Sequence, residues 1–375
     1  MKSIYLVFDR IQSKSDGGLG VTYANLVKEL ENDFEIKLVS VFKSKKTDYK
    51  EFEKLETVTL YDKEIDMRFP YYLLHPIKNR QRFLKSFLSS LKFISGFLHC
   101  KSKSLSILKG EIVIASSPAA ALFLNKNIKY IMEVHTNYEY FWGNNLIGRL
   151  QSTFIPKPAL TVFRNKSDSE KASSKFTSDY IYNCFIPNIQ KDNYPIQRKP
   201  HSALFVGRLV EEKNPLLLLK ITEKIIKYVP DFTLDIYGDG PLYNTLQQEI
   251  FSHRLENNIA LMGFTNDKSI YNKYDVLWLS SKNEGFGLVI IEAMASGTPT
   301  VSTEWGDAVY EIIENGKTGF ISKDLNDFAE KSANIILNKA LRDSLSKNCK
   351  KEFQEKFTAE KHRKRWLEII DKVYS

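Results

Sequence analysis

The most constraining stretch of this sequence is residues 283–297, NEGFGLVIIEAMASG, which follows a short apolar run at residues 275–279. Gly285 and Gly287 allow the backbone to turn sharply into the apolar segment 288–295. The pattern therefore predicts a strand, a loop and a buried helix. The first N–H groups of such a helix, together with the positive end of the helix dipole, attract phosphate.

Two glutamates flank this predicted anion site, with seven residues between them. Glu284 precedes the glycines, and Glu292 lies inside the predicted helix. Its neighbours three and four positions away carry no positive charge: they are Leu288, Val289, Ala295 and Ser296. Because a buried carboxylate without a partner is costly, we expect Glu292 to accept hydrogen bonds from ligand hydroxyls or from a neighbouring segment. A solvated glutamate is the alternative.

The first half of the chain alternates strand and helix patterns. Residues 4–8 predict a buried strand, followed by a loop with Gly17 and Gly18, which is either a simple turn or an anion site. Further strands are expected at residues 35–41, 111–116 and 129–134, which indicates a parallel sheet covered on both faces. The strand at 129–134 delivers His135 to the carboxyl end of the sheet, where open α/β proteins bind ligands. A purely structural histidine is the alternative.

The second half repeats this organisation from residue 203. A strand at 203–206 precedes a loop with Arg208 and Lys213, and a helix is expected from residue 216 to about 228. Asn214 suits the N-cap of that helix, with Pro215 in its first turn. Lys213 would then lie at the positive end of a helix, which is unfavourable unless an anion binds there. Arg208 and Lys213 together therefore indicate a diphosphate clamp.

The two glutamates at this spacing, followed by AMASGTPTV at residues 293–301, resemble the signature of retaining family 4 glycosyltransferases. The resemblance covers residues 201–330 closely and the first half thinly. It implies an α/β protein of GT-B fold, with two Rossmann-like doubly wound domains facing across a cleft. The expected parts are an N-terminal acceptor-binding domain, a linker, a nucleotide-sugar-binding domain and a C-terminal helix that packs back on the first domain, at residues 1–188, 189–200, 201–356 and 357–375.

The same resemblance implies roles for individual residues. Glu284 would bind hydroxyls of the transferred sugar, and Glu292 would hold the nucleotide ribose. The other residues expected to act in catalysis are Arg208 and Lys213, on the donor phosphates, and His135, on the donor sugar. The remaining donor-binding positions would face the diphosphate or the base: Gly17, Gly18, Met262, Phe264, Gly285, Phe286, Gly287, Leu288 and Val289.

We expect neither a metal ion nor another cofactor beside the nucleotide-sugar co-substrate. The sequence has no Asp-x-Asp pair after a strand and no histidine-carboxylate cluster. The three cysteines, Cys100, Cys184 and Cys349, are odd in number and far apart, which favours a reducing compartment over a disulfide framework. No signal peptide or membrane span is expected, since the apolar runs are too short.

The net charge of +9 is concentrated in residues 68–109, which carry nine cations and no acid. Within this segment, residues 82–98 repeat apolar side chains at helical spacing. A wide apolar helix face flanked by cations is typical of a helix in a membrane interface, although an ordinary packed helix has the same pattern. Nucleic acid is not an expected partner, because no recognised binding motif is present. We expect a cytoplasmic protein, peripheral on the anionic inner face of the plasma membrane.

The functional expectation is a retaining glycosyltransferase. It would move a sugar from a nucleotide-sugar donor, expected to be UDP-linked, to a glycan or lipid-linked saccharide acceptor in bacterial capsule or cell-surface polysaccharide synthesis. Two alternatives stay open: a GT-B-like nucleotide-sugar epimerase, and a membrane-bound scaffold with an inactive cleft. The sugar, the base and the acceptor depend on loop shape, which sequence patterns do not specify.

Overall fold

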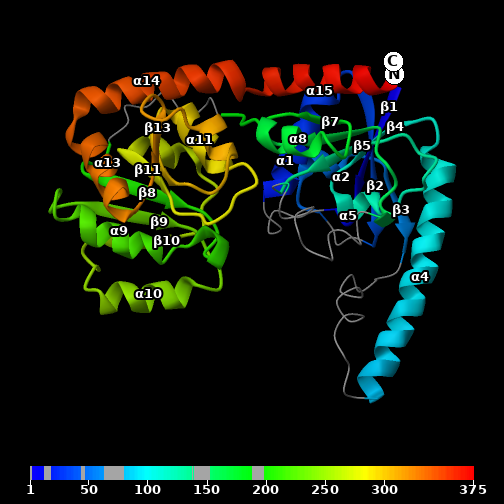
Figure 1. Ribbon diagram of the computed structural model, residues 1–375, viewed down its shortest axis with the longest axis horizontal. Helices are drawn as coiled ribbons and strands as arrows, with labels where there is room; N and C mark the ends of the chain where they lie inside the picture. The colour runs from blue at the N-terminus through cyan, green and yellow to red at the C-terminus, as the bar shows by residue number, and fades with distance from the viewer. Residues whose placement is uncertain are drawn as a thin grey trace. The chain divides into compact units, whose positions relative to one another are not determined.

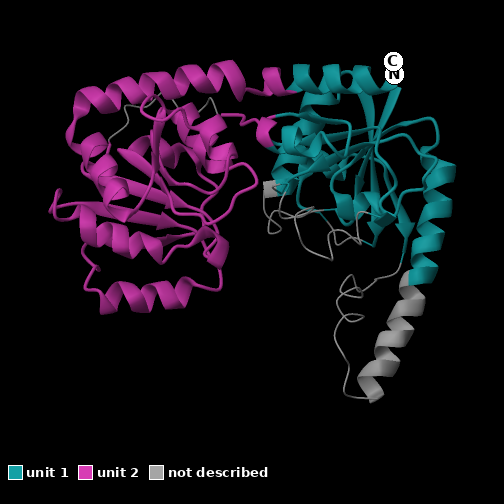
Figure 2. Cartoon of the chain, viewed as in Figure 1, with its two compact units in different colours: residues 1–164, 168–181, 363–375 teal, residues 165–167, 182–362 magenta. Residues whose placement is uncertain are grey.

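The computed structural model describes residues 2–11, 18–43, 47–62, 80–136, 138, 153–187 and 198–375, with the side chains of 18 and 80–93 excepted. The chain forms two compact units, coloured separately in Figure 2. Unit 1 comprises residues 1–164, 168–181 and 363–375, and unit 2 comprises residues 165–167 and 182–362. Gly17 and residues 189–197 of the predicted linker lie outside the described residues.

Unit 1 is built on a parallel sheet of seven strands in the order β3-β2-β1-β4-β5-β6-β7 (Figure 1). The strands are β1 (Lys2–Phe8), β2 (Phe34–Phe42), β3 (Thr57–Tyr61), β4 (Ile112–Ala115), β5 (Ile131–Val134), β6 (Leu160–Phe163) and β7 (Ser178–Tyr180). The helices between them are α1 (Gly18–Leu30), α2 (Lys50–Glu53), α4 (Arg80–Leu108), α5 (Pro118–Ala121) and α8 (Lys166–Ala172). The predicted doubly wound α/β architecture is confirmed.

Both faces of this sheet are covered, as the alternation along β1 shows. Ile4, Leu6 and Phe8 pack in one hydrophobic cluster, and Val7 packs in the cluster on the opposite face. Successive side chains of a strand point to opposite faces, so a strand that is apolar on both must lie inside the sheet. The predicted strands are near-continuous apolar runs because both of their faces are buried against helices.

The C-terminal helix α15 (Ala359–Tyr374) contributes its last twelve residues to unit 1. Trp366, Ile369 and Ile370 pack in the same hydrophobic cluster as β1 and α1. Arg363 binds both carboxylate oxygens of Asp33 at 2.6–3.1 Å. Apolar burial supplies most of the attachment, because a partly exposed ion pair contributes about 1 kcal/mol or less.

Unit 2 contains a parallel sheet of six strands in the order β10-β9-β8-β11-β12-β13. The strands are β8 (Ser202–Val206), β9 (Thr233–Tyr237), β10 (Ile259–Gly263), β11 (Val276–Leu279), β12 (Thr300–Thr303) and β13 (Gly319–Ser322). The α-helices are α9 (Leu217–Ile225), α10 (Tyr243–Ser252), α11 (Leu288–Ser296), α12 (Ala308–Ile312), α13 (Leu325–Leu337) and α14 (Lys339–Lys356). Since β9 and β10 extend the sheet to one side of β8, and β11 lies on the other, the strand order reverses between β8 and β11.

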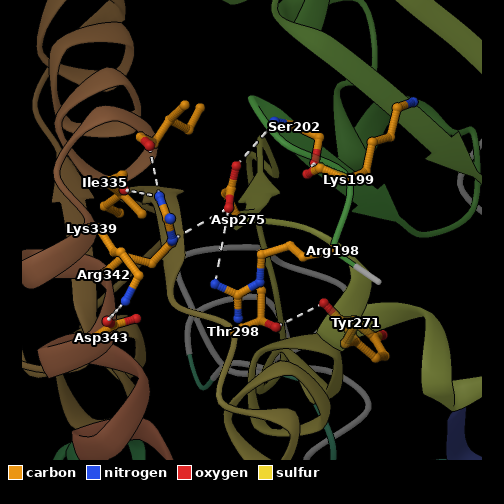
Figure 3. Close-up of polar contacts among 11 residues, drawn as sticks. Arg198, Lys199, Ser202, Tyr271, Asp275, Thr298, Ile335, Lys339, Arg342 and Asp343 are labelled. Atoms are coloured by element: carbon orange, nitrogen blue, oxygen red, sulfur yellow. Dashed lines mark hydrogen bonds and ion pairs between the residues drawn. The ribbon is translucent and has the colours of Figure 1, made fainter. Parts of the chain in front are cut away.

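A network of charged side chains lies at the amino edge of this second sheet (Figure 3). Asp275, which precedes β11 and is 2% exposed, accepts a hydrogen bond from the Ser202 N–H at 3.3 Å. One carboxylate oxygen of Asp275 lies 3.3 Å from Arg342 Nε and 4.0 Å from Arg198 Nη1. Arg342 also donates to the carbonyl oxygens of Ile335 and Ile336 at the end of α13. The network joins β8, β11, α13 and α14 at the edge opposite the loops that follow Val206 and Leu279.

The predicted amphipathic helix at residues 82–98 lies within α4. Ile94 and Leu98 are 50% and 62% exposed, so two members of the predicted apolar face contact solvent. Phe97, which also belongs to that face, is partly buried and packs against Phe123 in the core of unit 1. The remaining members lie at residues 82–93, whose side chains are outside the description. Across the described residues, no helix combines the length and the apolar character that crossing a bilayer requires.

Candidate functional site

The loop that carries Arg208 is fixed by close backbone packing at the carboxyl edge of the unit 2 sheet. A Cβ atom on Gly238 would lie 1.9 Å from the Gly207 carbonyl oxygen, so only glycine fits there. The Leu209 N–H donates to the Asp239 carbonyl at 2.8 Å. Arg208 itself is exposed and, among the described residues, no carboxylate pairs with it. A rigid backbone thus presents a cation that is available to a ligand.

Lys213 and Glu284 are paired with each other across the switch point between β8 and β11. The Lys213 ammonium lies 2.5 Å from Glu284 Oε1, and the Ser281 hydroxyl donates to the same oxygen at 2.6 Å. The Ser280 hydroxyl donates to the Lys213 carbonyl at 2.9 Å, which joins the two loops a second time. No hydrogen bond or ion pair from a described residue reaches Glu284 Oε2. That oxygen retains its capacity to accept hydrogen bonds from hydroxyl groups.

Asn214 does not cap the following helix, so that prediction is wrong. The residue has φ 49° and ends a short 3-10 helix, η3 (Glu211–Lys213), with its N–H on the Glu211 carbonyl. Helix α9 begins three residues later. Asparagine is among the few residues that adopt the left-handed conformation readily, and here that capacity outweighs its preference for N-caps. Lys213 is therefore held by Glu284 rather than by the dipole of α9.

The predicted strand, glycine loop and buried helix are present as β11, residues 280–287 and α11. Gly287 has φ 80°, which favours glycine, and a Cβ atom there would lie 2.9 Å from Ile290 Cδ1. The Gly287 carbonyl accepts from the Ile290 N–H at 2.9 Å. The side chain of Phe286 is buried in the hydrophobic cluster near Tyr182 and Phe357, so this residue offers only its main chain to a ligand.

Glu292 is buried in α11 and is paired by a neighbouring segment. Lys268 Nζ lies 2.7 Å from Oε1 and 2.8 Å from Oε2, and the Tyr271 hydroxyl donates to Oε2 at 2.5 Å. Burial and the adjacent carboxylate raise the pKa of Tyr271, which keeps its hydroxyl protonated as a donor. Both partners come from η4 (Lys268–Lys273), and sequence analysis missed them. The lack of a cation near Glu292 in its own helix was the signal that a partner had to come from elsewhere.

The base-side positions lie at the end of the edge strand β10. Met262 is 49% exposed and Phe264 is 70% exposed. Gly263 between them has φ 71°, and its carbonyl accepts from the Gly238 N–H at 2.9 Å. Large apolar side chains with this exposure offer a surface for a planar ring, and the adjoining main chain offers hydrogen bonds.

His135 lies in unit 1, directly after β5, within a buried polar cluster. Its Nε2 is 3.1 Å from Oε2 of Glu133, a residue with no exposed surface. Arg164, directly after β6, donates through Nε to His135 Nδ1 at 3.2 Å and pairs with Glu133 at 2.7 Å. The Tyr23 hydroxyl donates to the same carboxylate. Sequence analysis found His135 and missed its three neighbours, although Glu133 and Arg164 each stand at the end of an expected or actual strand.

Burial and the neighbouring guanidinium give this cluster perturbed titration. Burial first, and then Arg164, lower the pKa of His135 to about 4, while Glu133 opposes the shift. Burial raises the pKa of Glu133, but Arg164 and His135 lower it by more, so the net pKa lies below its ordinary value. At neutral pH the cluster therefore holds one carboxylate, one guanidinium and a neutral imidazole.

Gly18, also predicted as a donor contact, is the first residue of α1.

Comparisons with known proteins give relatives of one kind. Residues 188–352 match the family described as glycosyl transferases group 1. The chain is 28% identical over 257 residues to the GtfA subunit of a UDP-N-acetylglucosamine–peptide N-acetylglucosaminyltransferase from Streptococcus pneumoniae, covering 67% of this chain and 50% of that protein. It is 25% identical over 356 residues to an uncharacterized glycosyltransferase of Methanocaldococcus jannaschii, covering 92% of each. The chain thus spans about half the length of the GtfA subunit.

A solved structure with the same arrangement is that of a variant of S. aureus TarM in complex with Fondaparinux, alpha-GlcNAc-glycerol and UDP. It has a TM-score of 0.74 and 16% sequence identity, over 99% of this chain and 100% of that one. Its likeness establishes the fold as GT-B, in agreement with the two parallel sheets. Residues 188–352 thus belong to the group 1 glycosyltransferases, in a chain of GT-B fold.

Proposed function

We propose that this protein transfers a sugar with retention from a UDP-linked donor to a saccharide or lipid-linked acceptor in the synthesis of a bacterial capsule or other cell-surface polysaccharide. The observation that carries the proposal is the Lys213–Glu284 pair at 2.5 Å, which spans the switch point of the unit 2 sheet. Ligands of open α/β sheets bind at such points. Two relatives support the choice of nucleotide: GtfA is a subunit of a UDP-N-acetylglucosamine–peptide N-acetylglucosaminyltransferase, and the TarM variant was solved in complex with UDP.

The proposed work of unit 2 is to bind the donor and to stabilise its leaving group. Arg208 and the first N–H groups of α11 neutralise the diphosphate, with Lys213 as a second cation held ready by Glu284. A nucleoside diphosphate leaves with little need of a strong acid, so electrostatic stabilisation by fixed groups is sufficient. Glu284 Oε2 accepts from hydroxyls of the sugar, and Glu292 accepts from the ribose.

Lys268 has a defined part in this proposal. Both oxygens of Glu292 contact its ammonium, and 40% of the Lys268 side chain is exposed. A ribose diol needs acceptor positions on the same carboxylate, so the exposed lysine gives up one contact when the nucleotide binds, whereas Tyr271 stays in place. Lys268 and Tyr271 thereby keep Glu292 oriented before the donor arrives.

Metal independence is part of the proposal. The two cations Arg208 and Lys213 supply the positive charge that a divalent ion supplies elsewhere at a diphosphate. Their placement on loops after β8 supports this, because both are fixed by backbone contacts or by the pair with Glu284. Activity that survives EDTA would agree with it, and activity that requires added manganese would contradict it.

The proposed location is the inner face of the plasma membrane, where the protein is peripheral and α4 contacts anionic lipid. The exposed Ile94 and Leu98, and the cations of residues 68–109, support this proposal. A lipid-linked acceptor would then reach unit 1 from the membrane surface.

A panel of UDP-sugars tests the proposal in two stages. Thermal stabilisation of the protein by one UDP-sugar over the others would identify the donor, since a ligand at 100 times its Kd adds about 2.7 kcal/mol to the free energy of unfolding. Incubation of that donor with candidate acceptors must then release UDP and form a glycoside. If the donor is converted to an isomeric UDP-sugar instead, the protein is an epimerase. If no UDP-sugar or UDP binds, the proposal fails.

A further inference from the structure

The cluster around His135 contains more charge than the burial of a single histidine requires. Glu133 is fully buried and Arg164 is 2% exposed, and their closest approach is 2.7 Å. Replacing such a pair with well-packed apolar residues is often neutral or stabilising, so stability alone does not account for it. The pair lies at the carboxyl ends of β5 and β6, the edge at which sheets of this kind bind ligands.

The hydrogen bonds within the cluster specify one tautomer of the histidine. The Arg164 Nε–H donates to His135 Nδ1 at 3.2 Å, and Arg164 Nη2 lies 3.1 Å from His135 Nε2. With the proton on Nε2, two contacts are satisfied, because Nδ1 accepts from Arg164 and Nε2 donates to Glu133 Oε2 at 3.1 Å. With the proton on Nδ1, only the contact of Arg164 Nη2 with Nε2 would be satisfied, and the Glu133 oxygen would face an unprotonated nitrogen. With both nitrogens engaged inside the protein, the ring is neutral and fixed in orientation, and only 19% of its side chain is exposed.

We propose that Arg164 is a positioning residue that holds His135 as the neutral Nε2–H tautomer, with Glu133 as the acceptor that orients the ring. The proposal rests on the proposed function only for the contact of His135 with the transferred sugar. Among the described residues, the groups that face the ring are Glu133 of β5, Arg164 directly after β6, and Tyr23 of α1. His135 then presents a fixed, uncharged ring to the sugar and takes no part in proton transfer.

The direct test is the titration of His135 by NMR on the ¹⁵N-labelled full-length chain. A His135→Gln variant identifies its signals among the six histidines. The expected result for the wild type is an Nε2–H ring that stays neutral down to pH 5. In Arg164→Met the Glu133 carboxylate keeps its charge while the guanidinium is lost, so the pKa of His135 should rise by roughly 1–3 units.

A second variant keeps the test valid if the lone carboxylate destabilises the fold. In Glu133→Gln/Arg164→Met both charges are removed together, so burial alone acts on the ring, which should again be neutral at pH 7 but free to change tautomer. A wild-type ring that titrates near 6.5, or that carries its proton on Nδ1, would overturn the proposal. So would an Arg164→Met ring whose titration matches the wild type.

The transfer reaction supplies the functional readout. Below the new pKa, the activity of Arg164→Met should fall about tenfold per pH unit relative to the wild type, while Arg164→Lys should retain most of the wild-type profile. A residue that only stabilised the fold would lower activity by the same factor at every pH, and that result would contradict the positioning role. If the wild type transfers no sugar at all, the proposed function fails, whereas the NMR titration still decides the role of Arg164.

Discussion

Glu284 and Glu292 are both paired in this protein, but their partners differ in a way that separates their proposed roles. Glu284 contacts a lysine and a serine through one oxygen, and its second oxygen receives no hydrogen bond from the described residues. Glu292 uses both oxygens for Lys268 and one for Tyr271. These contacts agree with the proposed roles, in which Glu284 meets a group whose charge changes during reaction and Glu292 holds a group that changes little.

Replacing Glu292 with glutamine should weaken binding of UDP and of the donor equally, by roughly 1.5–3 kcal/mol, because hydrogen bonds to a charged group are lost. Calorimetry with UDP measures this, and kcat at saturating donor should change little. Glu355→Gln on the exposed side of α14 is a matched control that should bind UDP normally. Undiminished UDP binding by Glu292→Gln would remove this residue from the nucleotide site.

Replacing Glu284 with glutamine should lower kcat by roughly 2–4 kcal/mol, the cost of losing one electrostatic stabiliser of the transition state. The substitution also releases Lys213, so UDP binding should be kept or strengthened. Steady-state kinetics beside calorimetry separates the two effects. A loss of UDP affinity with unchanged kcat would reverse the roles assigned to the two glutamates.

At the residue level, the sequence identified charges and missed their partners. Arg208, Lys213, Glu284 and Glu292 were found because their spacing within strand–loop–helix patterns resembles a family. Lys268 was not found, because it reaches Glu292 across 24 positions and no local periodicity links the two segments. Long-range ion pairs depend on the course of the backbone, which becomes known only when the strand order is known.

At the level of strands and helices, the two edges of the unit 2 sheet differ in how their charged side chains are exposed and paired. The carboxyl edge carries exposed or partly exposed charges, including Arg208, whereas the amino edge holds the buried Asp275 with its two arginines. Lys199, next to Arg198, pairs with the buried Asp235 of β9 at 2.8 Å. Consecutive residues before β8 are thus fixed to two strands.

Asp275→Asn should lower the free energy of unfolding by roughly 3–5 kcal/mol, because it leaves the buried guanidinium of Arg342 without its carboxylate. Asp343→Asn is the matched control on the same helix as Arg342: its pair with Lys339 is exposed and contributes about 0.5 kcal/mol or less. Urea denaturation of both variants measures the difference. Equal stability of the two would show that the amino-edge network is not a structural element of the fold.

The lowered pKa of His135, at the carboxyl edge of β5 and β6, predicts how the free energy of unfolding depends on pH. Since the pKa of His135 is about 4 in the folded chain and ordinarily 6.5, the unfolded chain binds one more proton between these values. Stability is therefore fully present above pH 6.5 and is lost as pH falls toward 4, by up to about 1.4 kcal/mol per pH unit. The lowered pKa of Glu133 acts in the same direction at still lower pH. Urea denaturation at several pH values should show this loss of stability between pH 6.5 and 4 in the wild type, and the loss should be absent from His135→Gln.

The sequence predicted most strands of the buried sheets, since central parallel strands are short, continuous apolar runs. It missed β3, whose TVTLY alternates polar and apolar residues at the sheet edge, and three strands of three or four residues, β6, β7 and β13. It also assigned Asn214 to a helix cap. An asparagine suits both an N-cap and a left-handed turn, and the choice depends on the preceding turn, whose Glu212 and Lys213 carbonyls accept hydrogen bonds from Lys282 and Ser280.

At the scale of the whole molecule, the fold class followed from the alternation of elements, and the family match confirmed it over residues 188–352. The identity of the acceptor could not be predicted in the same way. Unit 1 shows only thin resemblance to the family in sequence, which is the expected result where different relatives bind different acceptors. The proposed membrane location likewise rests on one helix surface rather than on the fold.

Replacing Arg80, Arg82, Lys85 and Lys92 with glutamine should weaken binding to anionic vesicles, by up to roughly 1 kcal/mol for each cation removed. Activity on a lipid-linked acceptor should fall, and UDP binding should not change. The matched control removes four exposed lysines of α14, Lys347, Lys350, Lys351 and Lys356, and thereby the same charge. Equal vesicle binding by the two variants would mean that net charge, and not α4, brings the protein to the surface.

The most direct test of the account is an NMR time course of the transfer reaction, with the UDP-sugar that stabilises the protein, a saccharide acceptor and EDTA. The account predicts release of UDP together with a glycoside whose anomeric configuration is that of the donor, and loss of both signals in the Lys213→Gln/Glu284→Gln variant. A glycoside of inverted configuration, or a reaction that requires a restored divalent ion, would contradict the account. So would full activity in the double variant.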